Sequence, residues 1–471
     1  MQVGGSSQTT QFSLLTASDA APPRVTAVVV GKGPIGLFCH EQLQGLEFVH
    51  SGSCAVPFHS WIERGQRLYQ TEVFDAMELT KRGLYYCGNW FDSFCFSEFN
   101  EPSLCLLPQR NEDRKVDTLL IGLTPVGGSW TSYHSEQKTV SPLTYVGLPH
   151  HSIVSWYQNK KLGYDPQKKR EKISAPDLCQ YYRECYPASE SGSLNARVCR
   201  ATRLRNEEWL LDLSLAQPSG EVISQQVQCR YLVMACGKNN PRFLGIPGEK
   251  DNSVVHTSRD AREWLLKADK PLQVLVIGKG LSAVDVISCA MNAKLQHQVT
   301  HVIPPAGSYP KRMHSSSGVL DRIKDQGDEY PDHAKVWQYI HYPEAAPPGY
   351  RQMRDVRLQS IQEQEHTLRM ASGEESTEQF DLTAILIGSD SDFPELYLQQ
   401  DFGDQLLRDD MQAVSEELDI CTMESLHKNL FFIGMCTGEP FQRFGNGHGM
   451  AVAETIKTRE YDQPVSKDQT Q

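Results

Sequence analysis

The sequence predicts an α/β protein built from two nested Rossmann-like dinucleotide-binding domains, with an aromatic-rich insertion. Two glycine loops of one design, GKGPIG at residues 31–36 and GKGLSA at residues 278–283, carry this prediction. Each loop directly follows a strand-like apolar run, VTAVVV at 25–30 or LQVLVI at 272–277, and directly precedes a helix-like segment. The third observation is that two such folds account for all the other strand-like runs of the chain.

The glycine loops have the residue types that a dinucleotide requires. The first glycine makes a tight turn, the second lets the backbone approach a pyrophosphate, and the third small residue lets the helix pack on the strand while its N-terminus faces the anion. One loop suggests one dinucleotide, whereas two suggest a flavin and a nicotinamide nucleotide that reduces it. The alternative is that both loops are merely strand-turn-helix corners. The predicted contact residues of the loops are Gly31, Gly33, Gly36, Gly278, Gly280, Ser282 and Ala283.

Composition limits the other possibilities. The 471 residues suggest two or three domains, and the net charge of -12 argues against a nucleic-acid partner. No apolar stretch reaches membrane-spanning length, and residues 1–23 lack the features of a secretion signal. The 13 cysteines form no C-x-x-C pair, so neither a disulfide framework nor a zinc site is indicated, and we expect a reducing, cytoplasmic location.

The first predicted domain is interrupted soon after it begins. Residues 25–30 are expected to form a strand and residues 37–46 a helix, but the next apolar strand comes only at 118–121. The intervening stretch, about 47–115, is rich in aromatic residues. We interpret it as helical padding or a substrate-side cap, and the alternative is that its aromatic side chains simply fill the core.

Further small residues follow the next two strands of this domain. The strand at 118–121 leads into Gly127-Gly128-Ser129-Trp130, where paired glycines let the backbone approach a planar ring. A helix is expected from 175 to 186, with Pro and Asp in its first turn. The buried strand that begins at residue 231 ends at Gly237, and the proline-broken segment 241–249 predicts a domain boundary.

The second glycine loop begins the next unit. Strands are expected at 298–303, 383–388 and 430–434, followed by a glycine-rich turn and a final helix from about 449 to 457. The polar ends of the chain are expected to be flexible. The predicted divisions are a tail at 1–24, an FAD-binding domain at 25–270 and 384–459, an NADPH-binding domain at 271–383, and a tail at 460–471.

These motifs, in this order, resemble one family. The segments are 28–36, 127–130, 145–149, 177–183, 244–249, 276–283, 386–389 and 434–453. Together they are similar to the oxidative stress-induced growth inhibitor family, a branch of the class B flavin-containing monooxygenases. The resemblance covers about residues 25–457.

The resemblance implies FAD in a split domain and NADPH in an inserted one. In the wider class, NADPH reduces the flavin, which then uses molecular oxygen to oxygenate a small-molecule substrate. The family is linked to oxidative-stress responses, growth control and cell death, so protein partners in growth regulation are also implied.

Three positions depart from the wider pattern. No carboxylate follows the strand at 118–121, where flavin folds normally place an acid on the adenosine ribose. His256 is the one catalytic candidate, because it keeps the histidine of a partial monooxygenase fingerprint; the alternative is a hinge or core histidine. Lys311 and Arg312 could reach the 2'-phosphate of NADPH, and the absence of a carboxylate between Ile303 and Asp321 disfavours NAD; the alternative is that both basic residues are simply solvated.

The C-terminal motif resembles the flavin-ring end of such proteins. There the resemblance implies that Gly434 approaches the cofactor and that Glu439 accepts a ribityl hydroxyl. Glycines 445, 447 and 449 would then admit the isoalloxazine beside the final helix, whose positive end stabilises the reduced ring.

No other catalytic motif competes with this interpretation. The chain has no H-E-x-x-H, G-x-S-x-G or Walker lysine loop, and no metal site is expected. The alternative function comes from the missing ribose acid and the partial fingerprint: a regulatory scaffold that keeps the fold and acts through protein contacts.

Overall fold

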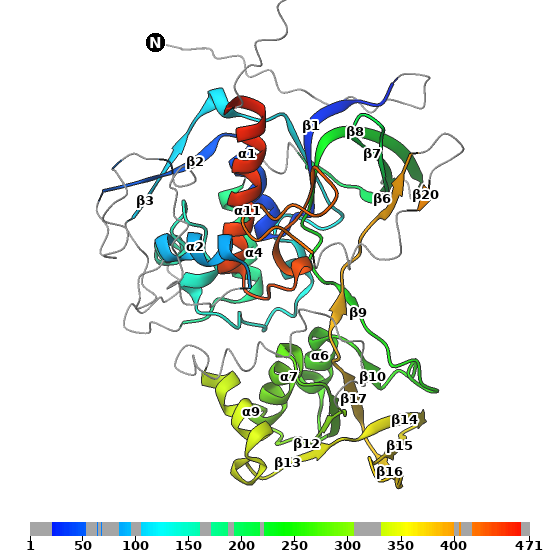
Figure 1. Ribbon diagram of the computed structural model, residues 1–471. Coiled ribbons are helices and arrows are strands. Elements are labelled where there is room, and N and C mark those ends of the chain that lie inside the picture. The colour runs from blue at the N-terminus through cyan, green and yellow to red at the C-terminus, as the bar shows by residue number, and fades with distance from the viewer. Residues whose placement is uncertain are drawn as a thin grey trace, which may run out of the picture.

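The computed structural model describes residues 21–52, 64, 67, 84–95, 105–160, 171–186, 193–216, 221–305, 331–399, 405–406 and 417–462. These residues form two bodies joined by two chain crossings near β9 (Asn240–Pro241) (Figure 1). Each body is built around one large sheet. The α/β class and the two-unit architecture predicted from the glycine loops are confirmed.

The first sheet has nine strands in the described part of the chain, in the order β20-β19-β6-β7-β8-β1-β4-β5, with β21 also paired to β8. The long strand β8 joins two kinds of sheet, since it pairs antiparallel with β7 but parallel with β1 and β21. The strands are β1 (Arg24–Val30), β4 (Thr118–Ile121), β5 (Ser193–Leu194), β6 (Arg197–Arg203), β7 (Trp209–Ala216), β8 (Val222–Met234), β19 (Glu395–Leu398), β20 (Gln405–Leu406) and β21 (Leu430–Phe432).

The second sheet is parallel throughout and has the order β10-β17-β11-β12-β13. Its central strand β11 leads into the second glycine loop, as β1 leads into the first. The strands are β10 (Val254–Val255), β11 (Gln273–Ile277), β12 (Gln298–Ile303), β13 (Tyr350–Arg354) and β17 (Leu382–Ile385).

Three small sheets complete the strands of the described residues. β9 pairs antiparallel with β18 where the chain crosses between the two bodies, and the pair is fastened by Arg242, whose Nε and Nη2 donate to Asp390 at 2.9 and 2.8 Å. The remaining strands are β2 (Leu46–His50), β3 (Leu106–Arg110), β14 (Arg357–Gln362), β15 (Glu365–Arg369), β16 (Glu375–Gln379) and β18 (Ser389–Asp390).

Helices cover the faces of both sheets. In the first body, α1 packs closely against α11, and α11 also packs against α2 (Figure 1). The α-helices are α1 (Pro34–Leu43), α2 (Tyr86–Cys95), α3 (Ile153–Asn159), α4 (Ala175–Cys185), α6 (Ser258–Lys267), α7 (Leu281–Asn292), α9 (Pro331–His341) and α11 (Gln442–Lys457). The 3₁₀ turns are η3 (Glu112–Arg114), η4 (Gly128–Ser132), η5 (Leu143–Val146), η6 (Pro343–Ala345) and η7 (Gly434–Thr437), and η8 (Thr458–Asp462) is a π-helix.

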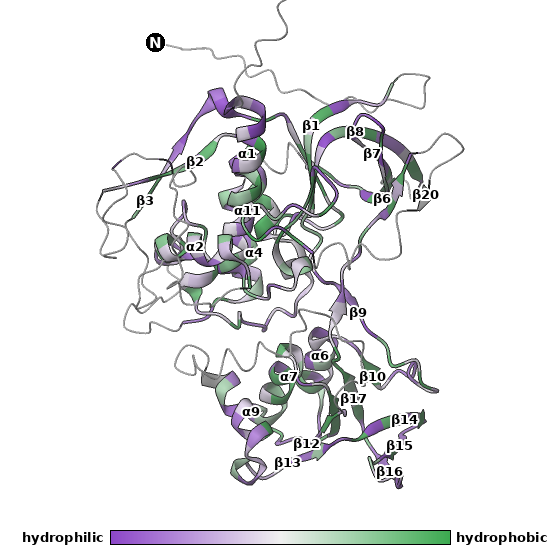
Figure 2. Cartoon of the chain, in the orientation of Figure 1, coloured by the Kyte–Doolittle hydropathy of each residue, from purple (hydrophilic) through white to green (hydrophobic). Residues whose placement is uncertain are grey.

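Apolar residues concentrate on the central strands of both sheets (Figure 2). In the first body, one core cluster lies between the sheet and α1, α2 and α11, and includes the fully buried Phe38 and Phe91. The corresponding cluster of the second body packs Val274 and Val276 of β11 against Val284 of α7. No helix of the described residues is both long and apolar enough to cross a membrane.

The insertion between α1 and β4 is mixed rather than helical. Its described residues form β2, α2, β3 and η3, and β2 begins at Leu46, inside the segment that was expected to continue the first helix. Helix α1 stops at Leu43 because Gly45 turns the chain with a φ of 98°. Cys105, just before β3, is disulfide-bonded, which the expectation of a reducing compartment did not predict.

The predicted domain boundaries stay predictions, but the sheets extend past two of them. The second sheet takes in β10 at 254–255, before the expected start at 271, and β17 continues to residue 385, beyond the expected end at 383. At the C-terminus, η8 continues to Asp462, so helical structure reaches beyond residue 459. Residues 1–20 of the expected tail at 1–24, and the end of the chain from 463, lie outside the described residues.

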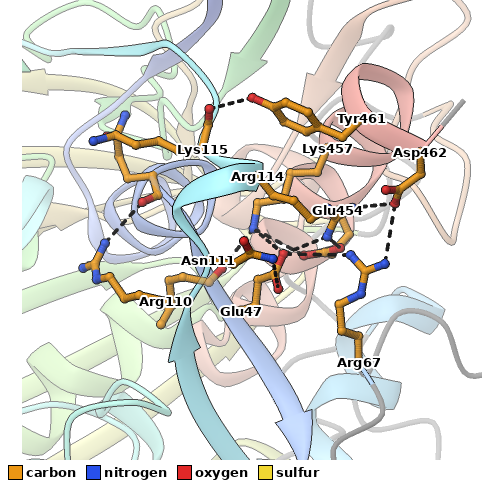
Figure 3. Close-up of polar contacts among 12 residues, drawn as sticks. Glu47, Arg67, Arg110, Asn111, Arg114, Lys115, Glu454, Lys457, Tyr461 and Asp462 are labelled. Atoms are coloured by element: carbon orange, nitrogen blue, oxygen red, sulfur yellow. Dashed lines mark hydrogen bonds and ion pairs between the residues drawn. The ribbon is translucent and has the colours of Figure 1, made fainter.

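A buried ion cluster fastens the end of α11 to the β2–β3 sheet (Figure 3). Arg114 donates to Glu47 at 2.7 Å, to Glu454 at 3.2 Å and to Asp462 at 2.7 Å. Lys457, which is fully buried, lies 3.6 Å from Glu47. Burial alone would raise the pKa of Glu47, but the hydrogen bond from Arg114 and the charge of Lys457 hold that pKa below its ordinary value. The cluster therefore keeps the Glu47 carboxylate charged inside the fold.

Candidate dinucleotide-binding site

The first glycine loop turns where β1 ends, at the centre of the first sheet. Gly31 has a φ of 127° and donates its N–H to the Ile121 carbonyl at 2.7 Å. A Cβ at Gly31 would lie 2.2 Å from the carbonyl oxygen of Ala235, and a Cβ at Gly36 would lie 2.1 Å from the Gly31 oxygen. Both positions therefore require glycine to bring strand, turn and helix together, as the sequence predicts.

The second glycine of this loop has a different environment. Gly33 is the N-cap of α1, with an extended backbone, and a Cβ there would have no atom within 4 Å. No side chain of the described residues caps this end of α1. The first backbone N–H groups of a helix need acceptors, and a phosphate at this end provides them. The open space and the uncapped helix fit the pyrophosphate of a dinucleotide.

The Gly127-Gly128 pair lies directly on the first loop. Gly127, with a φ of 110°, donates its N–H to the Lys32 carbonyl at 3.0 Å, and a Cβ at Gly128 would lie 2.6 Å from the Gly33 Cα. Trp130 follows on η4, and its ring meets Tyr133 edge-on at 5.0 Å between centroids. The paired glycines thus place this segment beside the anion end of α1. Gly237, with a φ of 68°, follows the carboxyl end of the neighbouring strand β8.

The second loop repeats the geometry of the first. Gly278 has a φ of 124°, and a Cβ there would lie 2.2 Å from the Leu386 oxygen. Gly280 is the N-cap of α7, which again lacks a side-chain cap among the described residues. Ala283 is fully buried against the sheet, and Ser282 is exposed. The second helix therefore also presents an uncapped N-terminus to an anion.

A buried histidine holds the turning glycine of this second loop. The Nε2 of His301 lies 2.6 Å from the Gly278 carbonyl oxygen, and its Nδ1 lies 2.7 Å from the Tyr350 hydroxyl. Since a carbonyl only accepts, Nε2 donates, and Nδ1 accepts from Tyr350. Burial lowers the pKa of His301 to about 4, so the ring is neutral near pH 7.

The N-termini of α7 and α11 meet across the two bodies. Leu281, the residue after Gly280, packs against Phe441 and Phe444 at the start of α11. Val140 completes this small apolar cluster. The second glycine loop therefore lies next to the end of the first body at which the sequence places the flavin ring.

Glu439 lies at that end and is almost fully buried. Its carboxylate accepts the Leu84 N–H at 2.7 Å and the Phe441 N–H at 3.2 Å. Leu84 comes from the insertion, so the carboxylate joins the insertion to the loop before α11. The predicted ribityl contact stays a prediction, since a carboxylate can accept about four hydrogen bonds. Gly434 turns with a φ of 73° against Ile35 of α1.

The expected glycine-rich turn before the final helix is wrong. Residues 445, 447 and 449 lie inside α11, which begins at Gln442 rather than near 449. A Cβ at Gly445 would lie 2.8 Å from the Ile35 side chain, one at Gly447 would lie 2.3 Å from the Cys87 oxygen, and one at Gly449 would lie 3.3 Å from the Cys39 Cβ. These glycines therefore pack against α1 and α2, and the interpretation that they admit the isoalloxazine is wrong.

The remaining predicted residues have varied positions. His256 lies 3.1 Å from Glu249, which also accepts the backbone N–H groups of Leu244, Gly245 and Ile246. Its ring also meets Phe243 at 4.4 Å between centroids. These contacts hold the connector to β10 and match the hinge alternative. Lys311 and Arg312 lie outside the described residues.

Sequence reasoning missed Lys32 and His301 as parts of the loops. Lys32 is only 3% exposed, and its Nζ donates to the Asn195 side-chain oxygen. A lysine within a glycine loop normally suggests a solvated side chain, and no local pattern shows that this one points inward. For His301, the one available signal was its place within a predicted strand, directly before Val302 and Ile303.

Comparisons with known proteins agree with this geometry. The family model of pyridine nucleotide-disulphide oxidoreductases matches residues 111–434. The chain is 25% identical to mouse oxidative stress-induced growth inhibitor 1, covering 96% of this chain and 98% of that protein. This relative confirms the family resemblance seen in the sequence.

Solved structures share the fold. Bacillithiol disulfide reductase from Bacillus cereus superposes with a TM-score of 0.52 at 14% identity, covering 93% of this chain and 99% of that one. Ornithine hydroxylase from Pseudomonas aeruginosa superposes with a TM-score of 0.50 at 12% identity, covering 93% and 100%. With the family model matched over more than half of its length, the chain belongs to the pyridine nucleotide-disulphide oxidoreductase family.

Proposed function

We propose that the protein is an FAD-dependent, NADPH-using oxidoreductase of the monooxygenase type. The family supports a flavoprotein oxidoreductase, and the proposal adds the cofactors' identities, the use of molecular oxygen and a small-molecule substrate. The relatives' names add a role in oxidative stress and growth regulation. A cytoplasmic location is part of the proposal.

The observation that carries this proposal is a pair of uncapped helix N-termini, those of α1 and α7, of which the second lies against the start of α11. Gly33 and the Gly127-Gly128 pair would hold the pyrophosphate of FAD, while Gly278 and Gly280 would hold that of NADPH. Leu281, packed on Phe441 and Phe444, brings the second loop to the predicted ring end of the first. Two nucleotides that must exchange a hydride need such neighbouring sites, because the reacting atoms have to approach within about 3.5 Å.

FAD, when bound, supplies the hydride-accepting and oxygen-reducing chemistry. The chain's own residues bind and orient. The α1 and α7 N-termini would fix the two pyrophosphates, and Glu439 would hold the ribityl chain. The apolar cluster of Leu281, Phe441 and Phe444 would exclude water between the nucleotides.

Oxygen consumption by the flavin-loaded protein tests the proposal. We expect NADPH to be oxidised in air with consumption of oxygen, and a Gly280→Asp variant to lose both. NADPH oxidation that proceeds unchanged without oxygen or another acceptor would be inconsistent with it.

The second candidate is a catalytically weak scaffold that regulates growth through protein contacts. Its support is that the insertion already engages Glu439 through Leu84 and places α2 against Gly447 of α11. Colourless protein that refuses added FAD while remaining folded would favour this candidate.

A further inference from the structure

The two glycine loops carry the same lysine but place it differently. Both begin Gly-Lys-Gly, with Lys32 in the first loop and Lys279 in the second. Lys279 is exposed, whereas Lys32 is 3% exposed and donates from Nζ to the side-chain oxygen of Asn195. Because lysines at matching positions of one motif differ so strongly, the inward position of Lys32 arises from its surroundings in the first sheet.

Lys32 lies across the carboxyl ends of three neighbouring parallel strands. It follows β1, Gly122 follows β4, and Asn195 follows β5, and these strands are adjacent in the sheet. Gly122 donates its N–H to the Leu194 carbonyl at 3.1 Å. A Cβ at Gly122 would lie 3.1 Å from the Lys32 Cγ and 3.3 Å from the Lys32 N. The lysine stem therefore occupies the space over Gly122.

This packing accounts for the carboxylate that the sequence lacks. In flavin folds of this type, the residue after the second strand is an acid that holds the adenosine ribose hydroxyls. Here that residue is Gly122, and a longer side chain would meet Lys32. The acid is therefore missing at the position where the buried lysine stem occupies the space of its side chain.

We propose that Lys32 and Asn195 together recognise the adenosine ribose of FAD in place of the carboxylate. The ammonium of Lys32 donates to a ribose hydroxyl oxygen, and the Oδ1 of Asn195 accepts from a ribose hydroxyl. The pair offers both a donor and an acceptor, whereas an acid offers acceptors alone. This inference rests on the proposed function, since it presumes that FAD occupies the first loop.

Titration of deflavinated protein with FAD, followed by flavin fluorescence, tests the pair. A Lys32→Met variant should bind FAD roughly 10- to 100-fold more weakly, because one charge-assisted hydrogen bond is lost. Asn195→Ala should weaken binding in the same direction and, being at an exposed residue, should leave the fold intact. Lys279→Met is the matched control and should bind FAD like the parent.

A second ligand locates the contact on FAD. The second ligand is an FAD analogue with 2'-deoxyribose in its adenosine half. The parent should bind this analogue more weakly than it binds FAD, whereas Lys32→Met should bind both with the same affinity. FMN, which lacks the adenosine, should bind parent and variant equally.

The outcomes separate the two claims. If the parent takes up no FAD, the proposed function fails. If the parent binds FAD and both Lys32→Met and Asn195→Ala bind it equally well, the ribose assignment is overturned while the proposed function stands. Should Lys32→Met lose its fold by circular dichroism, Asn195→Ala and the deoxyribose analogue decide the question.

Discussion

A substitution at Gly33 should change folding and FAD binding in opposite directions. Gly33 is the N-cap of α1 with an extended backbone, so a side chain enters without strain, and a Cβ would meet no atom within 4 Å. Aspartate is a preferred N-cap residue, because its carboxylate accepts the free N–H groups of the first turn. Gly33→Asp should therefore leave the apoprotein as stable as the parent or a few tenths of a kcal/mol more stable.

The same carboxylate takes the N–H groups that the pyrophosphate needs and repels the phosphates. Two unit charges about 5 Å apart repel by about 3 kcal/mol at an effective dielectric constant of about 20. FAD should thus bind at least roughly 100-fold more weakly. Gly33→Asn, which caps the helix without a charge, separates the electrostatic part of this loss from the steric part.

The assay is flavin content after purification, followed by FAD titration and thermal unfolding of the apoprotein. Gly31→Ala is the contrasting variant, since its Cβ would lie 2.2 Å from the Ala235 oxygen at a φ of 127°, and it should fail to fold. Undiminished FAD binding by Gly33→Asp would remove the first loop from the flavin site.

The other predictions concern the second loop and pH. Gly280→Asp should leave FAD bound but stop NADPH from reducing it; normal reduction would show that the nicotinamide docks elsewhere. In stopped-flow flavin reduction, the Lys311→Ala, Arg312→Ala double variant should bind NADPH roughly 10- to 100-fold more weakly and NADH almost as the parent does. Equal losses of affinity for both would refute the assignment of Lys311 and Arg312 to the 2'-phosphate. His301→Leu should lower the NADPH affinity measured by titration without lowering the FAD content, and His301→Gln should keep an NADPH affinity near that of the parent. Identical NADPH affinity in the parent and both variants would assign His301 to folding alone. Four histidines with lowered pKa values, three buried and one half-buried, should make the free energy of unfolding fall as the pH drops below about 6.5. The fall should be up to about 1.4 kcal/mol per histidine and pH unit, so a flat urea-unfolding series down to about pH 5 would contradict those values. They are His40 and His301, with pKa values of about 4, and His150 and His448, with pKa values of about 3.

The sign of this pH effect follows from burial. The charged form of each histidine is disfavoured in the folded protein, so the folded pKa lies below the unfolded one, 6.5. The stability that these groups contribute is present above about pH 6.5 and is lost as the pH falls toward the folded values.

Local patterns predicted the framework well. The strands that lead into the glycine loops, at 25–30 and 272–277, lie within one residue of β1 and β11. Gly31 and Gly278 turn with the positive φ angles that their motif requires. These features depend on neighbours in the sequence, which is why the sequence alone contains them.

The final helix could not be placed in the same way. Glycine costs about 1 kcal/mol in a helix relative to alanine, so three glycines between 445 and 449 favour a turn. In the structure, α1 and α2 approach these positions closely, and at Gly447 a Cβ would lie 2.3 Å from the Cys87 oxygen, so only glycine fits there. Tertiary packing overrides the local preference, and the partners come from hundreds of residues earlier in the chain.

The site residues that were missed share this dependence on distant segments. Lys32 donates to Asn195, 163 positions away, and His301 accepts from Tyr350, 49 positions away. The direction of each side chain is set by strands and loops that become neighbours only on folding. A lysine or a histidine at such a place therefore looks in the sequence like an ordinary polar residue.

Anaerobic titration of the purified protein with NADPH tests the central claim most directly. We expect yellow protein that carries one equivalent of FAD and whose visible flavin absorbance is bleached by one equivalent of NADPH, returning when air is admitted. Folded protein that is colourless and takes up no FAD, or bound flavin that NADPH leaves oxidised, would contradict the claim that the two glycine loops hold a flavin and the nicotinamide nucleotide that reduces it.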